Sequence, residues 1–124
     1  MRKALVIDDD DIARELIVSV LEEGGYETFD LPSPIGATQT IIGRGIDVLV
    51  LDLLMPALSG DKLARMLRSN PRLQRLVIVL VSSDIDQLRD ISVSVKADAV
   101  VSKAEIRWKL LPTLKSIKKR SVAS

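Results

Sequence analysis

Short apolar runs rich in Val, Leu and Ile alternate along the chain with segments whose apolar residues recur at helical spacing. Apolar runs of this length, each ending in polar residues, are typical of strands buried on both faces of a parallel sheet. The pattern predicts five strands, at Lys3–Ile7, Glu27–Leu31, Asp47–Leu51, Leu76–Val81 and Ala99–Val101.

Helical segments follow each strand. They run from Asp11 to about Glu23, from the Pro32-Ser33-Pro34 turn to Gly43 and Gly45, from Gly60 to about Ser69, from Asp84 to about Val95, and over Glu105–Lys119. Asp11 and Ser59 are placed to cap two of these helices, and Asp84 followed by Gln87 resembles a capping box. We expect Pro112 to kink or break the last helix. Strict alternation predicts a doubly wound α/β fold, with a parallel sheet and helices on both faces.

Composition narrows the possible functions. The chain has 124 residues, which fits one domain spanning residues 1–124, and it carries a net charge of +1. It contains neither Cys nor His, which excludes disulfides, thiolate metal sites and imidazole chemistry within the chain. No apolar stretch approaches the ~20 residues needed to span a bilayer. We therefore expect a cytoplasmic protein that binds neither DNA nor membrane.

Acidic residues follow two of the predicted strands. The first strand runs into Asp8-Asp9-Asp10-Asp11, and the third runs into Asp52. Ligands of open α/β sheets bind at the carboxyl ends of the strands, so Asp8, Asp9 and Asp52 converge there if the two strands are neighbours. Repulsion among like charges at such a site favours binding of protons or of a hard divalent cation such as Mg²⁺.

Polar residues also end the last two strands. Ser82 and Ser83 follow the fourth strand, and Lys103 follows the fifth. An Asp carboxylate can act as a nucleophile and form an aspartyl phosphate, while Lys and Ser bind phosphate oxygens. Together with the acidic cluster, these residues indicate phosphoryl transfer.

Four motifs in this order resemble the receiver domain of two-component response regulators, of the single-domain chemotaxis type. They are Val6-Ile7-Asp8-Asp9, the segment Val50-Leu51-Asp52-Leu53-Leu54-Met55-Pro56 with Gly60, Val81-Ser82-Ser83, and Lys103. The resemblance covers essentially the whole chain. It implies a flavodoxin-like sheet with strand order 2-1-3-4-5 and a bacterial phosphorelay protein that signals rather than turns over a separate substrate.

The resemblance also implies a role for each matching residue. Asp52 would accept the phosphoryl group from a sensor histidine kinase or a histidine phosphotransfer protein. Asp9, Asp52 and the backbone carbonyl of Leu54 would ligate Mg²⁺, with Asp8 acting through water. Lys103 would pair with Asp52 at rest and with the phosphoryl group afterwards, and Ser82 would be the switch hydroxyl. Ser83, beside it, is counted with Ser82 and Lys103 among the phosphate-binding and switch residues, although its side chain has no evident role beyond turn chemistry.

Two positions depart from the family pattern. Ala104 follows Lys103 where the family usually has Pro, so we expect a trans peptide there, because a non-proline cis bond costs about 2.5–4 kcal/mol. Val100 stands in the fifth strand where the family often has Tyr or Phe. The chemical site is thus intact, and we infer retained phosphorylation with altered output.

The output surface is expected on the fourth helix, fifth strand and fifth helix. Trp108 lies off the buried stripe of the last helix, which suits either an interface anchor or simple packing. With no effector domain in this sequence, output would be binding of a downstream protein or of a second copy. Two alternatives remain: a pseudo-receiver that is never phosphorylated, and a small haloacid-dehalogenase-type phosphatase using Asp8 and Asp10.

Overall fold

The computed structural model confirms the predicted alternation of strands and helices. It describes residues 2–55, 60–84, 86, 90–91 and 95–123, with side chains as far as residue 117. The strands are β1 (Lys3–Ile7), β2 (Glu27–Leu31), β3 (Val48–Asp52), β4 (Val77–Ser82) and β5 (Ala99–Ser102). The helices are α1 (Asp11–Glu23), α2 (Ala37–Arg44), α3 (Gly60–Arg68) and α5 (Ile106–Ala123), with 3₁₀ turns at η1 (Pro71–Leu73) and η2 (Lys103–Glu105).

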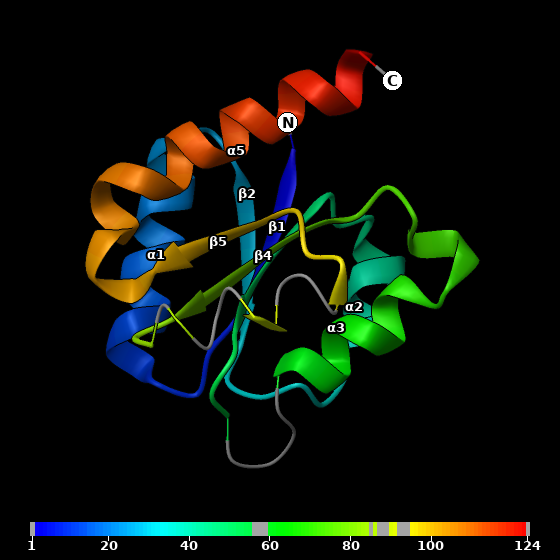
Figure 1. Ribbon diagram of the computed structural model, residues 1–124, viewed down its shortest axis with the longest axis horizontal. Coiled ribbons are helices and arrows are strands. Elements are labelled where there is room, and N and C mark those ends of the chain that lie inside the picture. Colours follow the sequence, from blue (N-terminus) through cyan, green and yellow to red (C-terminus); the bar gives the residue numbers. More distant parts are fainter. Residues whose placement is uncertain (1, 56–59, 85, 87–89, 92–94, 124) are drawn as a thin grey trace.

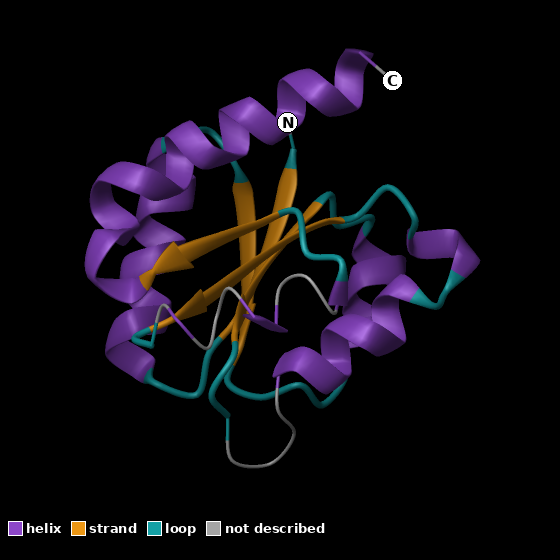
Figure 2. Ribbon diagram, viewed as in Figure 1, coloured by secondary structure: helices purple, strands orange, loops and turns teal. Residues whose placement is uncertain are grey.

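The five strands form one parallel sheet in the order β2-β1-β3-β4-β5, which confirms the order that the family resemblance implies. Figure 1 shows α1 and α5 on one side of this sheet and α2 and α3 on the other. The same layers are visible in Figure 2, where the strands form the central orange layer. Because β1 and β3 are neighbours, the acidic residues that follow them share one edge of the sheet.

Alternate residues along each central strand face opposite layers, because side chains in a strand point to opposite faces with a period of two. Leu49 and Leu51 of β3 belong to the core beneath α2 and α3. Val48 and Val50 of the same strand belong to the core beneath α1 and α5. Both faces of the sheet are thus buried by aliphatic side chains, which leaves the strand ends to carry polar groups.

Helix α1 is capped one residue earlier in the chain than predicted. Its N-cap is Asp10, whose carboxylate accepts a hydrogen bond from the Ile12 N–H, so the prediction that Asp11 caps this helix is wrong. Asp11 is the first helical residue, where its negative charge interacts favourably with the helix dipole. The predicted stop is confirmed, since Gly24 caps the carboxyl end and Gly25 follows with φ of +88°.

Helix α5 runs unbroken through Pro112 from Ile106 to Ala123, so the predicted break does not occur. Pro112 is exposed, and water can replace the backbone hydrogen bond that proline removes. The buried stripe is confirmed and consists of Ile106, Leu110, Leu114 and Ile117. Within the described part of the chain, no helix combines the length and apolarity of a bilayer-spanning segment.

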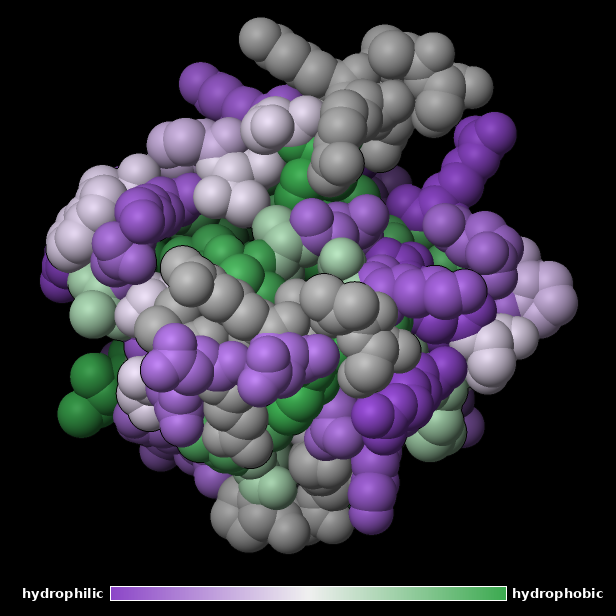
Figure 3. Space-filling model, in the orientation of Figure 1, coloured by the Kyte–Doolittle hydropathy of each residue, from purple (hydrophilic) through white to green (hydrophobic). Residues whose placement is uncertain are grey.

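Helix α3 is strongly amphipathic, with Leu63, Ala64 and Leu67 buried against the sheet. Hydrophilic residues gather over α3 at the right of the space-filling view, while apolar residues show mainly between the elements (Figure 3). The cap predicted at Ser59 lies outside the described residues. In the helix predicted from Asp84 to Val95, the described residues 86, 90–91 and 95 are helical, and the rest lie outside the described part.

Candidate phosphoacceptor and metal site

The predicted acidic cluster forms at the carboxyl edge of the sheet. Asp8 follows β1 directly, and Asp52 is the last residue of β3. Asp8, Asp9 and Asp52 each offer a carboxylate oxygen, and these oxygens lie within 4.8 Å of one another. Asp8 and Asp52 are buried, whereas Asp9 is exposed to solvent. The cluster therefore combines two buried carboxylates with one exposed carboxylate, which a ligand from solvent can reach.

Asp8 is fully buried, and its two carboxylate oxygens have different partners. Its Oδ1 accepts a hydrogen bond of 2.9 Å from the Asp10 N–H. Its Oδ2 lies 3.0 Å from Lys103 Nζ in an ion pair and has no further hydrogen-bond partner among the described residues. A buried carboxylate oxygen with spare acceptor capacity is suited to bind a cation or ordered water.

Asp52 is also buried, with 2% of its surface exposed. Its Oδ1 accepts a hydrogen bond of 3.3 Å from the Leu54 N–H and lies 3.5 Å from Lys103 Nζ. Burial, together with the negative charge of Asp8, raises the pKa of Asp52 to about 6, although Lys103 and the Leu54 N–H act in the opposite direction. Asp52 is therefore largely ionised at neutral pH, despite its burial.

Lys103 reaches the cluster from the edge strand β5, at the point where this strand ends and η2 begins. Ser102 caps this turn by accepting a hydrogen bond from the Ala104 N–H, and the Lys103–Ala104 peptide is trans, as expected. The predicted pairing with Asp52 is present, but Asp8 is the closer partner. Burial lowers the pKa of Lys103, yet the two carboxylates outweigh it and the net shift is upward.

The remaining predicted residues lie around this cluster at different depths. Ser82 is buried at the end of β4, one residue beyond Val81, the register partner of Asp52. Its Oγ accepts a hydrogen bond of 3.1 Å from the Asp84 N–H, while Ser83 is exposed. Val100 is partly buried against the core. Trp108 is 60% exposed, away from the buried stripe of α5.

Arg14 was missed by the sequence reasoning. Its guanidinium donates to the Asp8 carbonyl oxygen at 2.8 Å, to Asp30 at 2.9 Å and to Asp11 at 2.6 Å. It therefore joins the turn after β1 to the start of α1 and the end of β2. The spacing of Asp11 and Arg14, three residues apart on one helix, is the sequence signal that could have indicated this contact.

Gly60 lies so close to the end of β3 that no side chain would fit at this position. It donates a backbone hydrogen bond to the Leu53 carbonyl oxygen at 3.1 Å. A Cβ added at Gly60 would collide with the Asp52 carbonyl oxygen and lie 3.0 Å from Leu53 Cα. Only glycine permits this close approach of α3 to the end of β3, which fixes the backbone of Asp52.

Comparison with known proteins identifies the class of protein that this fold and site define. The family model of the response regulator receiver domain matches residues 4–115. The chain therefore belongs to the receiver domain family of two-component response regulators. Receiver domains are signalling modules that interact with histidine kinases and downstream effectors, which agrees with the predicted class.

Individual relatives support this assignment. The chain is 29% identical over 118 residues to the phosphate regulon transcriptional regulatory protein PhoB of Pseudomonas aeruginosa, covering 94% of this chain and 52% of that protein. It is 26% identical over 121 residues to the transcriptional regulatory protein GltR of the same organism, covering 97% of this chain and 50% of GltR. The chain thus spans about half the length of these curated relatives.

Solved structures show the same fold. A CheY-like receiver domain from Methylobacillus flagellatus superposes with a TM-score of 0.83 at 28% identity, covering 94% of this chain and 98% of that one. A sensor protein from Polaromonas sp. JS666 gives a TM-score of 0.85 at 28% identity, covering 97% of this chain and 98% of that one.

Proposed function

We propose that this receiver domain, taken as one unit of residues 1–124, is a phosphorylation-dependent switch in which Asp52 accepts the phosphoryl group. The observation that carries this proposal is the placement of Asp52. Its carboxylate lies at the carboxyl edge of the sheet, 3.5 Å from Lys103 Nζ and in one cluster with Asp8 and Asp9. A buried, ionised carboxylate beside a cation is suited to nucleophilic attack on a phosphoryl group.

The donor would be the phosphohistidine of a sensor histidine kinase or a histidine phosphotransfer protein, since this chain contains no His. A carboxylate oxygen of Asp52 attacks the phosphorus atom and a new O–P bond forms. The P–N bond breaks, and its electron pair returns to the imidazole of the donor. Lys103 supplies a positive charge next to the oxygens on which negative charge accumulates.

Mg²⁺ is the cofactor that the donor set fits. Three carboxylates offer oxygens within 4.8 Å of one another, and the buried Asp8 Oδ2 has Lys103 as its one partner among the described residues, which leaves it acceptor capacity for the hard cation. Asp9 and Asp52 would bind it directly with the Leu54 carbonyl, and Asp8 would act through water. When bound, the ion would neutralise part of the negative charge on the phosphoryl group.

The phosphoryl group would then act on the polar residues around Asp52. It brings about two negative charges and additional acceptor oxygens, so Lys103, Ser82 and Ser83 acquire new partners. Ser82 Oγ accepts the Asp84 N–H, and a turn of Ser82 toward the phosphoryl group would release the loop after β4. Full conversion of such a switch requires roughly 5.5 kcal/mol of differential interaction.

Output would come from the surface of β5 and α5, where Trp108 is exposed and Val100 replaces the usual aromatic residue. Its target would be a downstream protein or a second copy of this chain, and the cytoplasm is the compartment that suits it. Any catalysis would be limited to the domain's own phosphorylation and dephosphorylation.

Two alternatives differ in what they require. A pseudo-receiver that is never phosphorylated is favoured by Val100 and Ala104, which depart from the family pattern. A dehalogenase-type phosphatase would need Asp10 at the reactive cluster. Asp10 instead accepts the Ile12 N–H as the N-cap of α1, which speaks against that chemistry.

The deciding experiment is mass spectrometry after incubation with Mg²⁺ and acetyl phosphate. We expect a gain of one phosphoryl group on the wild-type chain and none on Asp52→Asn, with the exposed Glu27→Gln as the acidic control that still gains it. An unmodified wild type, under conditions that phosphorylate a known receiver, would establish the pseudo-receiver.

Metal binding is tested separately by thermal unfolding over a Mg²⁺ titration. Selective binding to the folded chain raises its melting temperature by mass action. We expect this rise in the wild type, a smaller rise in Asp9→Ala and Asp52→Ala, and an unchanged rise in Glu27→Gln on the exposed part of β2. A titration that moves no melting temperature would remove the metal from the proposal.

A further inference from the structure

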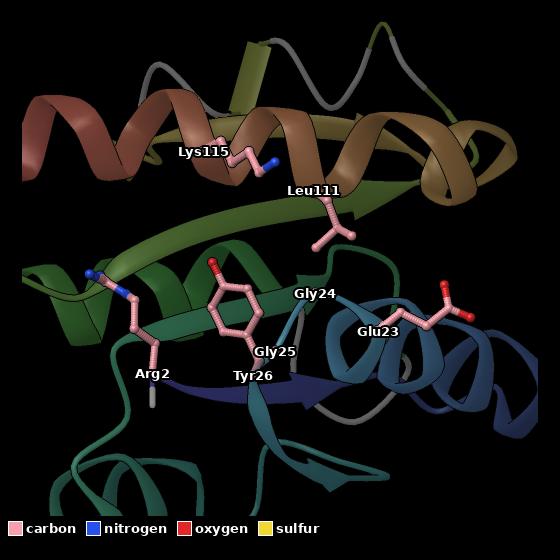
Figure 4. Close-up of a pocket in the computed structure, with 7 residues that line it drawn as sticks. All are labelled: Arg2, Glu23, Gly24, Gly25, Tyr26, Leu111 and Lys115. Carbon is pink, nitrogen blue, oxygen red and sulfur yellow. The ribbon is translucent and has the colours of Figure 1, made fainter.

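A cavity lies at the opposite end of the sheet from the acidic cluster. It has a volume of about 590 Å³ and lies among the start of β1, the end of α1, the start of β2 and the middle of α5 (Figure 4). Arg2 lines it just before β1, whereas Asp8 follows the same strand. At about 3.3 Å per residue the two lie roughly 20 Å apart along the strand, so a ligand here is separate from the phosphoacceptor site.

The apolar part of the cavity comes from Tyr26 and Leu111. Both are partly buried and pack against the core beneath α1 and α5. Figure 4 shows the Tyr26 ring and the Leu111 side chain beside the turn that contains Gly24 and Gly25. A Cβ at Gly24 would collide with the Leu111 side chain, so glycine is what allows Leu111 to lie over this turn. These side chains offer a surface for the hydrocarbon or aromatic body of a ligand.

The charged part of the cavity is cationic on balance. Arg2 and Lys115 contribute two positive charges, and Glu23 is the single acid among the lining residues. In Figure 4 the Glu23 carboxylate points away from Tyr26, while the Tyr26 hydroxyl points toward α5, which carries Lys115. Asp47 also acts on the Tyr26 phenol, and its carboxylate accepts a hydrogen bond from the Lys3 N–H.

Two residues that line this cavity carry hydrogen-bond donors suited to an anion, namely Arg2 and Tyr26. Arg2 Nε is buried and has no hydrogen-bond partner among the described residues. Burial raises the pKa of the Tyr26 phenol, with Arg2 opposing and Asp47 adding to the shift, so its hydroxyl is protonated and can donate at neutral pH. A buried N–H without an acceptor is destabilising, so a small shift of the Arg2 guanidinium toward the oxygens of a bound anion would be favourable.

We propose that this cavity binds a small organic anion. Its carboxylate or phosphate is held between Arg2 and Lys115, and its apolar body packs on Tyr26 and Leu111. The volume is in the range of small-molecule sites, which combine an apolar lining with a few placed polar groups. Such a ligand bridges α1, β2 and α5 and stabilises the fold by mass action.

The test uses phenyl phosphate, benzoate and inorganic phosphate as probes, in metal-free buffer, followed by the backbone amide NMR signals of Gly24, Gly25 and Tyr26. We expect saturable shifts with phenyl phosphate and benzoate, and binding of inorganic phosphate at least tenfold weaker because it has no apolar body. The Asp52→Asn variant should bind equally well. This result separates the cavity from the proposed phosphorylation, whose failure would leave the cavity binding unchanged.

Charge variants then test whether Arg2 and Lys115 bind the anion. Arg2→Gln combined with Lys115→Gln should weaken phenyl phosphate binding at least tenfold, and the exposed Arg107→Gln should leave it unchanged. Lys115→Gln alone, at an exposed position, keeps the test valid if the double variant unfolds. Unsaturable shifts, shifts centred on Lys103, or equal affinity in the wild type and the charge variants would overturn the proposal.

Discussion

Lys103 Nζ lies 3.0 Å from Asp8 Oδ2, closer than the 3.5 Å that separate it from Asp52 Oδ1. The ammonium group from the end of β5 therefore compensates mainly the fully buried Asp8, and it contacts the proposed phosphoacceptor as a second partner. This arrangement makes Lys103 important for stability before any phosphoryl group arrives.

Replacing Lys103 by Met should lower the free energy of unfolding by about 1–3 kcal/mol in metal-free buffer, because it leaves a buried carboxylate unpaired. Urea unfolding at neutral pH measures this change. Lys109→Met is the matched control, since the exposed Lys109–Glu105 pair should contribute less than about 1 kcal/mol. Adding Asp8→Asn to Lys103→Met should restore much of the lost stability. Equal losses in Lys103→Met and Lys109→Met would contradict this account.

The pH dependence of stability should report the pKa of Asp52. This pKa is raised from 3.8 to about 6 in the folded chain, so the folded state holds this proton more tightly than the unfolded state. The stability gained from this tighter proton binding is fully present below about pH 4 and is lost as the pH rises through 6. We expect metal-free Asp52→Asn to gain on the order of 2 kcal/mol relative to wild type between pH 4 and 7. Parallel stability curves for the two proteins would show that Asp52 titrates normally.

Arg14 should be required for the geometry of the turn after β1. Arg14→Lys keeps the charge but cannot bridge three acceptors, so we expect a loss of about 1–2 kcal/mol in unfolding free energy. We also expect a smaller Mg²⁺-induced rise in melting temperature than in the wild type. The exposed Arg107→Lys should change neither quantity. An unaltered Mg²⁺ response in Arg14→Lys would limit this residue to a purely structural role.

Gly60 should not tolerate even a methyl group. Gly60→Ala improves helix propensity but forces α3 away from the Asp52 backbone, and we expect a net destabilisation of about 1–3 kcal/mol. Gly43→Ala in α2 provides the comparison, because a Cβ there meets nothing within 4 Å. That control should gain about 0.5–1 kcal/mol from propensity alone. Thermal or urea unfolding distinguishes the two, and a stabilised Gly60→Ala would refute the packing argument.

The sequence alone determined the parallel sheet and the edge at which its polar residues meet. Uninterrupted aliphatic runs such as Val48–Leu51 can be satisfied only between two covering layers, and the residue after such a run must lie at a strand end. Asp8, Asp52 and Lys103 were predicted in this way. Local turn chemistry was less well determined, because Asp10 and Asp11 are both able to cap α1 and the sequence pattern does not choose between them.

Only the tertiary structure decided which groups touch. The preference of Lys103 for Asp8, the bridging contacts of Arg14 and the cavity beside Tyr26 join residues from separate segments of the chain. Periodicity fixes the face on which a residue lies, but contact between side chains depends on how far each neighbouring element is shifted and turned. Those shifts arise from packing across the whole core, and short-range patterns in the sequence do not contain them.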